Sequence, residues 1–236
     1  MVDAGEPIEI EGDGPRFVSR GGHKLDAALD AFAVDVAGRR ALDAGASTGG
    51  FTDCLLQRGA AEVIAVDVGY GQIALSLRDD PRVDVRERVN VRHMTAADVA
   101  APVDLVVGDL SFISLRTVMP ALLEISTLDA EMVLLVKPQF EAGRREAAKG
   151  SGVIRDPDVW RRVLHEVLAE LGQIAAGRGD QLGVVDVAAS PVRGPDGNRE
   201  FLAHLGRGVA GLSPELLADR IDQAVDHALD AERTRT

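Results

Sequence analysis

The chain has 236 residues, which is enough for one well-buried core and short for two independent catalytic domains. Its 46% apolar and 27% charged residues exclude an intrinsically disordered chain, and no apolar run approaches the ~18 residues of a membrane span. The net charge of −12 disfavours a general nucleic-acid coat protein, and the single cysteine, Cys54, excludes a disulfide framework. Because the first residues lack the pattern of a signal peptide, we expect a soluble cytoplasmic protein.

Segments with strand-like and helix-like patterns alternate along the chain. A first helix is predicted around Leu25, Ala28, Leu29 and Phe32, which form one apolar face, and a last helix begins near Ser213. The predicted strands are Ala41–Ala44, Val63–Val68, Val83–Arg86, Leu105–Asp109, Met132–Val136, Val184–Ala188 and Phe201–Leu205. The helices predicted between them are Phe51–Arg58, Gln72–Arg78, Ser114–Ile125 and Pro157–Leu171.

This alternation predicts the fold class. Strands separated by helix-length segments indicate βαβ units and a mostly parallel sheet. The last two predicted strands flank a Gly- and Pro-rich turn at 191–198, which indicates an antiparallel hairpin. We therefore predict a Rossmann-like α/β fold, with a mostly parallel seven-stranded sheet, helices on both faces and a C-terminal antiparallel hairpin.

Polar residues follow several predicted strands at their carboxyl ends, where ligands bind in open α/β sheets. They are Asp43 with the loop Gly45–Gly50, then Asp67, Asn90, Asp109 and Lys137. Five such positions at successive strand ends predict a binding site along this edge of the sheet.

The segment Leu42–Phe51 reads as a strand, a glycine-rich turn and a helix start. Its spacing departs from the G-x-G-x-x-G of dinucleotide-binding proteins, which disfavours a nucleotide-dependent oxidoreductase of Rossmann type. It matches the D-x-G-x-[G/S]-x-G loop of class I methyltransferases, and Asp67 ends the next strand, where it can accept both hydroxyls of a ribose. The cofactor of class I methyltransferases is S-adenosylmethionine. The residues predicted to bind it are Asp43, Gly45, Ser47, Gly49, Gly50, Phe51, Asp67 and Asn90. The alternative role for Asn90 is to cap a loop.

Four further segments carry a family resemblance: Val18–Leu25 (VSRGGHKL), Gly108–Ile113 (GDLSFI), Val136–Glu141 (VKPQFE) and Asn198–Phe201 (NREF). With these motifs the chain resembles, over roughly 17–205, the TlyA family of haemolysin-labelled ribosomal RNA 2′-O-methyltransferases, which are related in fold to the FtsJ enzymes. The resemblance implies S-adenosylmethionine as methyl donor and a ribose 2′-hydroxyl of a cytidine in ribosomal RNA as acceptor. The haemolysin label leaves a membrane-active protein as the alternative, although no apolar segment of spanning length supports it.

The resemblance also implies a catalytic tetrad of Lys24, Asp109, Lys137 and Glu200. Lys137 would remove the proton of the 2′-hydroxyl if neutral, or stabilise the alkoxide if charged. Because the methyl group of the donor is already activated, no metal is required. The chain contains only three lysines against 23 arginines, which suggests that a retained lysine has a role arginine cannot fill. A structural network of ion pairs is the alternative for these four residues.

Members of that family carry a small RNA-binding domain ahead of the SRGGHK motif. We expect residues 1–16 to be a remnant of that domain or a linker to it, and residues 17–236 to form the methyltransferase domain. For ribosomal RNA or a ribosomal subunit as partner, the basic residues predicted to bind are Arg16, Arg20, Arg144, Arg145 and Lys149. The last three lie in a Gly-rich stretch whose alternative is a solvated loop without a partner.

Overall fold

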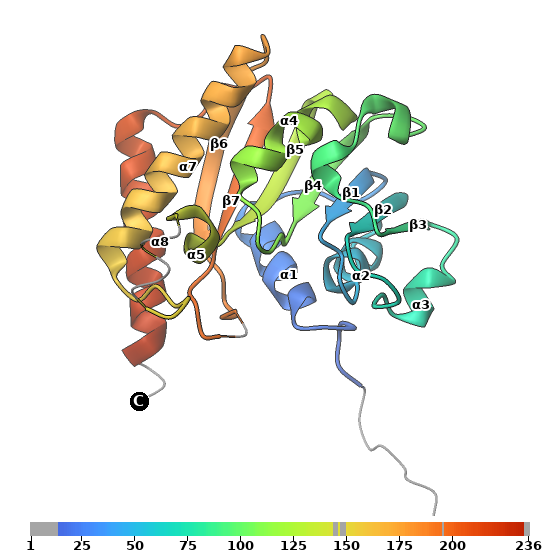
Figure 1. The fold of residues 1–236 in the computed structure, drawn as a ribbon, viewed down its shortest axis with the longest axis horizontal. Helices are drawn as coiled ribbons and strands as arrows, with labels where there is room; N and C mark the ends of the chain where they lie inside the picture. The colour runs from blue at the N-terminus through green and yellow to red at the C-terminus, as the bar shows by residue number, and fades with distance from the viewer. Residues whose placement is uncertain (1–13, 144–145, 147–149, 195, 234–236) are drawn as a thin grey trace, which may run out of the picture.

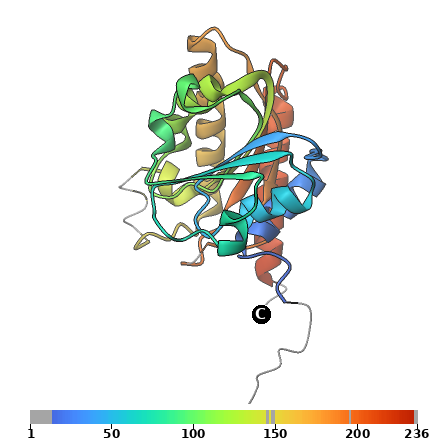
Figure 2. The same ribbon diagram turned by 90° about the vertical axis from the view of Figure 1, so that its right-hand side faces the viewer.

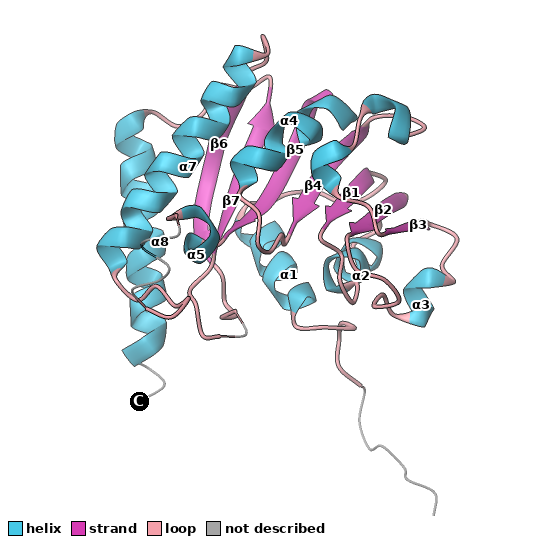
Figure 3. Ribbon diagram, viewed as in Figure 1, coloured by secondary structure: helices cyan, strands magenta, loops and turns pink. Residues whose placement is uncertain are grey.

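The computed structural model describes residues 14–143, 146, 150–194 and 196–233, and within them seven strands form a single sheet (Figures 1 and 3). The strands are β1 (Arg40–Ala44), β2 (Glu62–Asp67), β3 (Val83–Glu87), β4 (Val103–Gly108), β5 (Ser126–Val136), β6 (Leu182–Ala189) and β7 (Phe201–Arg207). The helices are α1 (Gly21–Ala31), α2 (Gly50–Gln57), α3 (Leu75–Arg78), α4 (Leu115–Ile125), α5 (Pro138–Glu141), α7 (Pro157–Gly177) and α8 (Pro214–Arg233). Two short 3₁₀ helices, Val91–His93 and Ala96–Asp98, lie between β3 and β4.

The strand order is β3-β2-β1-β4-β5-β7-β6. Strands β1 to β5 run parallel to one another, whereas β7 is antiparallel to both of its neighbours, β5 and β6. The mostly parallel seven-stranded sheet and its C-terminal antiparallel hairpin are therefore confirmed. The hairpin is not simply added at the edge, because β7 is inserted between β5 and β6.

Helices cover both faces of the sheet, as predicted (Figure 2). On one face, α4 and α7 bury side chains such as Leu122 and Val163 against the strands. On the other face, α1 and α2 bury Leu25 and Leu55 in a second apolar cluster. Helix α8 packs beside the edge strand β6. Burial of apolar surface on both sides explains why the central strands read as continuous apolar runs.

Three element boundaries differ from the sequence predictions by three residues or more. Strand β5 begins at Ser126, not Met132, because α4 runs directly into it and Ser126 pairs with Val103 of β4 before a register shift. This first half contains the polar residues Ser126, Thr127 and Asp129, and its Leu128 is exposed, so it lacks the apolar signal. Helix α7 continues to Gly177 because Ala175 extends its buried face, and α3 begins only at Leu75.

The entry into α1 is tightly packed, and this packing positions the first residue of the predicted tetrad. Phe17 is buried against the start of the helix, and a Cβ atom on Gly22 would lie 2.3 Å from the Phe17 Cγ atom. Only glycine therefore lets α1 approach Phe17 this closely. Two residues later, the same turn of α1 carries Lys24 into a buried position.

We expect Gly22→Ala to lower the free energy of unfolding by about 1–3 kcal/mol, the usual cost of overpacking a buried contact. The matched control is Gly177→Ala at the end of α7, where an added Cβ meets nothing within 4 Å. It should leave stability unchanged or raise it by about 0.5–1 kcal/mol. Urea denaturation measures both variants, and equal stabilities for the two would contradict this account of the α1 entry.

Candidate active site

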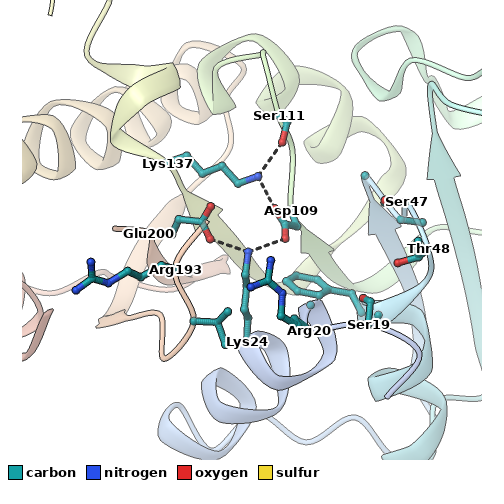
Figure 4. Close-up of a pocket in the computed structure, with 16 residues that line it drawn as sticks. Ser19, Arg20, Lys24, Ser47, Thr48, Asp109, Ser111, Lys137, Arg193 and Glu200 are labelled. Carbon is teal, nitrogen blue, oxygen red and sulfur yellow. Dashed lines mark hydrogen bonds and ion pairs between the residues drawn. The ribbon is translucent and has the colours of Figure 1, made fainter. Parts of the chain in front are cut away.

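Two adjoining cavities open at the carboxyl ends of β1, β2 and β4. The smaller, of about 310 Å³, is lined by residues of α1, the glycine loop and the start of β7, and it contains all four predicted tetrad residues (Figure 4). The larger, of about 590 Å³, extends toward the ends of β2 and β3. Gly45, Ser47, Asp109 and Ser111 line both cavities. Together they form one continuous site with two compartments.

The four predicted tetrad residues meet in a line of alternating charges. Lys24 Nζ lies 2.6 Å from Glu200 Oε2 and 3.2 Å from Asp109 Oδ2. The other oxygen of Asp109, Oδ1, lies 2.5 Å from Lys137 Nζ, which also donates to Ser111 Oγ at 2.9 Å. The side chains converge from α1, from the ends of β4 and β5, and from the residue before β7 (Figure 4).

Three of these side chains are removed from water: Lys24 is 7%, Lys137 8% and Glu200 2% exposed. Burial alone would lower the pKa of Lys24, but the charges of Asp109 and Glu200 outweigh it and the pKa is raised. Burial raises the pKa of Glu200, and the charge of Lys24 opposes that rise only in part. Lys24 is therefore a fixed ammonium held between two carboxylates, whereas Lys137 contacts one carboxylate and one hydroxyl.

The glycine loop owes its shape to backbone conformations that favour glycine. Gly45 and Gly49 have φ angles of +89° and +96°, and a Cβ on Gly45 would lie 2.8 Å from the Asp109 carbonyl oxygen. Ser47, between them, is also left-handed at φ +48° and donates its backbone N–H to Asp67 Oδ2 at 2.9 Å. Asp67 thus holds the loop in place.

The structure places the predicted cofactor residues in different surroundings. Gly45, Ser47, Asp67 and Asn90 line the larger cavity, and Gly50 and Phe51 line the smaller one. Asn90 also accepts from the backbone N–H of Arg92, so it caps a 3₁₀ turn as well as facing the cavity. Gly49 and Asp43 line neither cavity; Gly49 turns the loop.

Asp43 lies beneath that loop and is fully buried. Its Oδ2 atom accepts from the backbone N–H of Thr52 at 2.9 Å and from the Thr52 hydroxyl at 2.7 Å, while Oδ1 has no hydrogen-bond partner. Burial raises the pKa of Asp43 to about 7, although the Thr52 bonds oppose that rise. Asp43 thus fixes α2 to β1 rather than facing the cavities.

Two of the five predicted RNA-binding residues, Arg16 and Arg20, lie in the part of the chain that the structure describes. Arg20 is exposed and lines the smaller cavity. Arg16 forms a two-pronged ion pair with Asp26 and lies over the ring of Phe17, so its guanidinium already has partners within the fold. Arg144, Arg145 and Lys149 lie outside the described residues.

Sequence reasoning missed two groups of residues around the cavities. Phe112 is 90% exposed with a φ of +63°, a rare conformation for a bulky side chain, and its ring lies 5.0 Å from that of Phe140. Next in the chain to Val89, which lines the larger cavity, the guanidinium of Arg88 lies 4.1 Å from the ring centre of Tyr70, whose side chain is exposed. The signal for Phe112 was its place in the GDLSF motif, but only the structure shows its exposure.

Across residues 14–143, 146, 150–194 and 196–233, no three His, Cys, Asp or Glu side chains are grouped so that they could hold a metal ion. In the same part of the chain, no helix has the length and apolarity needed to cross a membrane.

The chain resembles known proteins over most of its length. The family model described as "FtsJ-like methyltransferase" matches residues 17–207. A Mycobacterium tuberculosis protein named "16S/23S rRNA (cytidine-2'-O)-methyltransferase TlyA" is 53% identical over 212 residues, covering 89% of this chain and 76% of that protein. A Bacillus subtilis protein named "Putative rRNA methyltransferase YqxC" is 43% identical over 234 residues, covering 96% of this chain and 79% of that protein. A solved structure named "Putative hemolysin from Streptococcus thermophilus" has a TM-score of 0.84 at 38% identity, covering 94% of this chain and 79% of that one.

The buried Asp43 should make stability depend on pH in a defined direction. Since its pKa is higher in the folded than in the unfolded chain, the folded state binds more protons between about pH 4 and 7. The contribution of Asp43 to the free energy of unfolding is therefore present at low pH and lost as the pH rises toward 7, by up to about 1.4 kcal/mol per pH unit. Asp43→Asn should flatten the stability profile measured by urea denaturation between pH 5 and 8. Asp219→Asn, at an exposed position of α8, serves as the control and should leave the profile as in the wild type.

Proposed function

We propose that this chain, which belongs to the TlyA group of the FtsJ-like methyltransferase family, transfers the methyl group of S-adenosylmethionine to the 2′-hydroxyl of a cytidine ribose in ribosomal RNA. The observation that carries the proposal is the line of charges from Glu200 through Lys24 and Asp109 to Lys137, which lines the smaller cavity and reaches the larger one at Asp109. The family makes the chain an enzyme that uses S-adenosylmethionine. The choice of RNA, nucleotide and catalytic residues is our inference.

The larger cavity fits the adenosine part of the cofactor. Apolar side chains such as Val89, Leu110 and Ile113 offer surfaces for a flat base, while Asp67 and Asn90 offer oxygens and an amide to its polar edges and ribose hydroxyls. Asp67 keeps acceptor capacity for a ribose although each of its oxygens already accepts one backbone N–H, because a carboxylate has about four acceptor positions. We assign the smaller cavity to the methionine end and the acceptor ribose.

The bound cofactor supplies a methyl group on a sulfonium, which is already activated. The protein must therefore deprotonate or polarise a 2′-hydroxyl, which is a weak acid and a poor nucleophile. We assign to Lys137 the role of accepting this proton, because it lines the smaller cavity and its Nζ atom contacts Asp109 and Ser111, which line both cavities. The Ser111 hydroxyl, 2.9 Å from that atom, marks a position from which an oxygen can approach it. Alignment of the hydroxyl with the methyl group supplies much of the rate.

The remaining tetrad residues control Lys137. Asp109 holds the Lys137 Nζ atom in place through Oδ1. Asp109 is itself held by Lys24, which donates to its Oδ2 atom. Lys24 is in turn anchored to Glu200, so the orientation of Asp109 is set from both sides. With all four groups charged the line is neutral, and loss of one proton from Lys137 leaves a single negative charge shared with its neighbours.

On the RNA side, we assign a backbone phosphate beside the acceptor ribose to Arg20, which is exposed and lines the smaller cavity. The exposed ring of Phe112, beside Ser111, gives a surface on which a nucleobase can stack once it leaves its helix.

With ribosomal RNA as the substrate, we place the activity in the cytoplasm. The membrane-damaging activity that the hemolysin names of some relatives suggest is tested separately, by adding the protein to liposomes. We expect no leakage.

The proposal is tested by incubating the protein and S-adenosylmethionine with ribosomal RNA or ribosomal subunits that lack the modification, followed by mapping of 2′-O-methyl groups. A single new methylated cytidine is the expected result. Methylation of a base, or no methylation of any ribosomal RNA, would contradict it.

We expect Asp67→Ala to weaken S-adenosylmethionine binding by about 1–3 kcal/mol, because the ribose hydroxyls of the cofactor lose their acceptor. Isothermal titration measures the dissociation constant. The control is Asp84→Ala on the neighbouring strand β3, whose carboxylate pairs with Arg86 and lines neither cavity. Unchanged affinity in Asp67→Ala would remove Asp67 from the cofactor site.

We expect Lys137→Arg to keep cofactor affinity within a few-fold and to lose roughly a hundredfold or more in methyl transfer, the usual scale for a general base. Arginine stays charged near neutral pH and is planar and larger, so it can neither accept the proton nor occupy the position of the ammonium. Lys24→Arg should be milder, since Lys24 supplies a fixed positive charge. Single-turnover methylation measures both variants, and a near wild-type rate for Lys137→Arg would reduce the tetrad to a structural ion network.

A further inference from the structure

One buried carboxylate beside the active site has no part in the mechanism above. Glu141 ends the VKPQFE motif, four residues after Lys137, and its side chain is 2% exposed. Its Oε2 atom accepts from the Ser114 hydroxyl at 2.6 Å and from Arg116 Nη1 at 2.8 Å, and its Oε1 atom accepts from the backbone N–H of Leu115 at 2.7 Å. Three short bonds to a buried carboxylate indicate a rigid connection.

The two segments joined by Glu141 are those that carry the reacting groups. All three donors lie at the start of α4, directly after the loop that contains Asp109, Ser111 and Phe112. Glu141 itself lies in α5, which begins immediately after Lys137. Because Lys137 Nζ rests on Asp109 and Ser111, its position depends on how these two segments are held together.

A second contact joins the same segments. The ring of Phe140 packs 5.0 Å from that of Phe112, and Lys137 Nζ lies 5.8 Å from the Phe140 ring centre. The apolar contact limits how far the segments can separate, whereas Glu141 adds three directed bonds between them that do not involve Lys137 itself. A shift of one segment would therefore change the distance from Lys137 to Asp109 without unfolding either.

The charge of Glu141 matters as well as its shape. Its oxygens face the N-terminal end of α4, where free backbone N–H groups favour a negative charge, and they face the guanidinium of Arg116. A glutamine has one acceptor oxygen and would turn an N–H₂ group toward one of the three donors. Arg116 has a second acid, Glu170 of α7, bound at 2.6 Å and 3.1 Å, which offers a control on the same arginine.

We propose that Glu141 is a positioning residue that holds Lys137 against Asp109 and Ser111 by tying α5 to the start of α4. This inference rests on the proposed function, since it names the residue that sets the geometry of the assigned base. It predicts that loss of Glu141 affects methyl transfer and spares cofactor binding, because Glu141 lines neither cavity.

The test compares Glu141→Gln with Glu170→Gln in single-turnover methylation of ribosomal RNA. We expect Glu141→Gln to lower kcat by about tenfold to a hundredfold, the range that follows from a displacement of reacting groups on the order of 1 Å. The dissociation constant for S-adenosylmethionine should stay within about twofold of wild type. Glu170→Gln, which leaves the three bonds of Glu141 intact, should keep the wild-type kcat.

A double-mutant cycle separates positioning from a general structural role. If Glu141 acts through Lys137, adding Glu141→Gln to Lys137→Arg causes no further loss of kcat, whereas independent structural damage multiplies the two losses. Should Glu141→Gln fail to fold, Ser114→Ala removes one of the three bonds and must lower kcat in the same direction with unchanged cofactor affinity. Wild-type kcat in the folded variants, or multiplied losses in the cycle, overturns the inference. An inactive wild-type protein would instead contradict the proposed function.

Discussion

Mutual charge compensation at the carboxyl edge of the sheet is the constraint on which the site depends. Lys24, Lys137 and Glu200 are almost entirely withdrawn from water, and each would be costly to bury alone. Their alternation with Asp109 gives every charge an opposite neighbour within 3.2 Å. Removing one partner leaves an uncompensated buried charge, so these four positions are coupled in stability as well as in chemistry.

This line of charges exists only because of the topology of the sheet. Strand β7 is antiparallel and inserted between β5 and β6, and Phe201 pairs with Val136 across the β5–β7 ladder. Lys137 directly follows β5 and Glu200 directly precedes β7, so the pairing register brings both to the same end of the sheet. A one-residue slip would send their neighbours to the opposite face. The inserted strand thus contributes a carboxylate that a purely parallel sheet would place elsewhere.

Backbone strain is concentrated around the same edge. Five non-glycine residues of the described chain adopt left-handed φ angles. Of these, Ser47 and Phe112 line the larger cavity, and Arg88 directly follows β3 at the same end of the sheet. Such conformations persist only where the surrounding contacts over-determine them. Asp67 holds Ser47 through its backbone N–H, Tyr70 packs against Arg88, and Phe140 packs against Phe112. These contacts therefore stabilise the left-handed conformations that orient the three side chains at this end of the sheet.

The sequence by itself determined the order of the elements and the glycine loop, and its family motifs selected the four residues of the proposed tetrad. Periodicity and turn residues are local signals, and motifs name residues wherever the chain carries them, so Lys24, Asp109, Lys137 and Glu200 could be chosen before their contacts were known. The tertiary structure decided the rest. In the folded chain β7 lies between β5 and β6, and Asp43 is buried beneath the glycine loop and does not line either cavity. Phe112 is exposed, and Glu141 accepts hydrogen bonds from three donors. These properties arise from strand register and from contacts between segments far apart in the chain, such as the 176 residues that separate Lys24 from Glu200, and no local pattern encodes them.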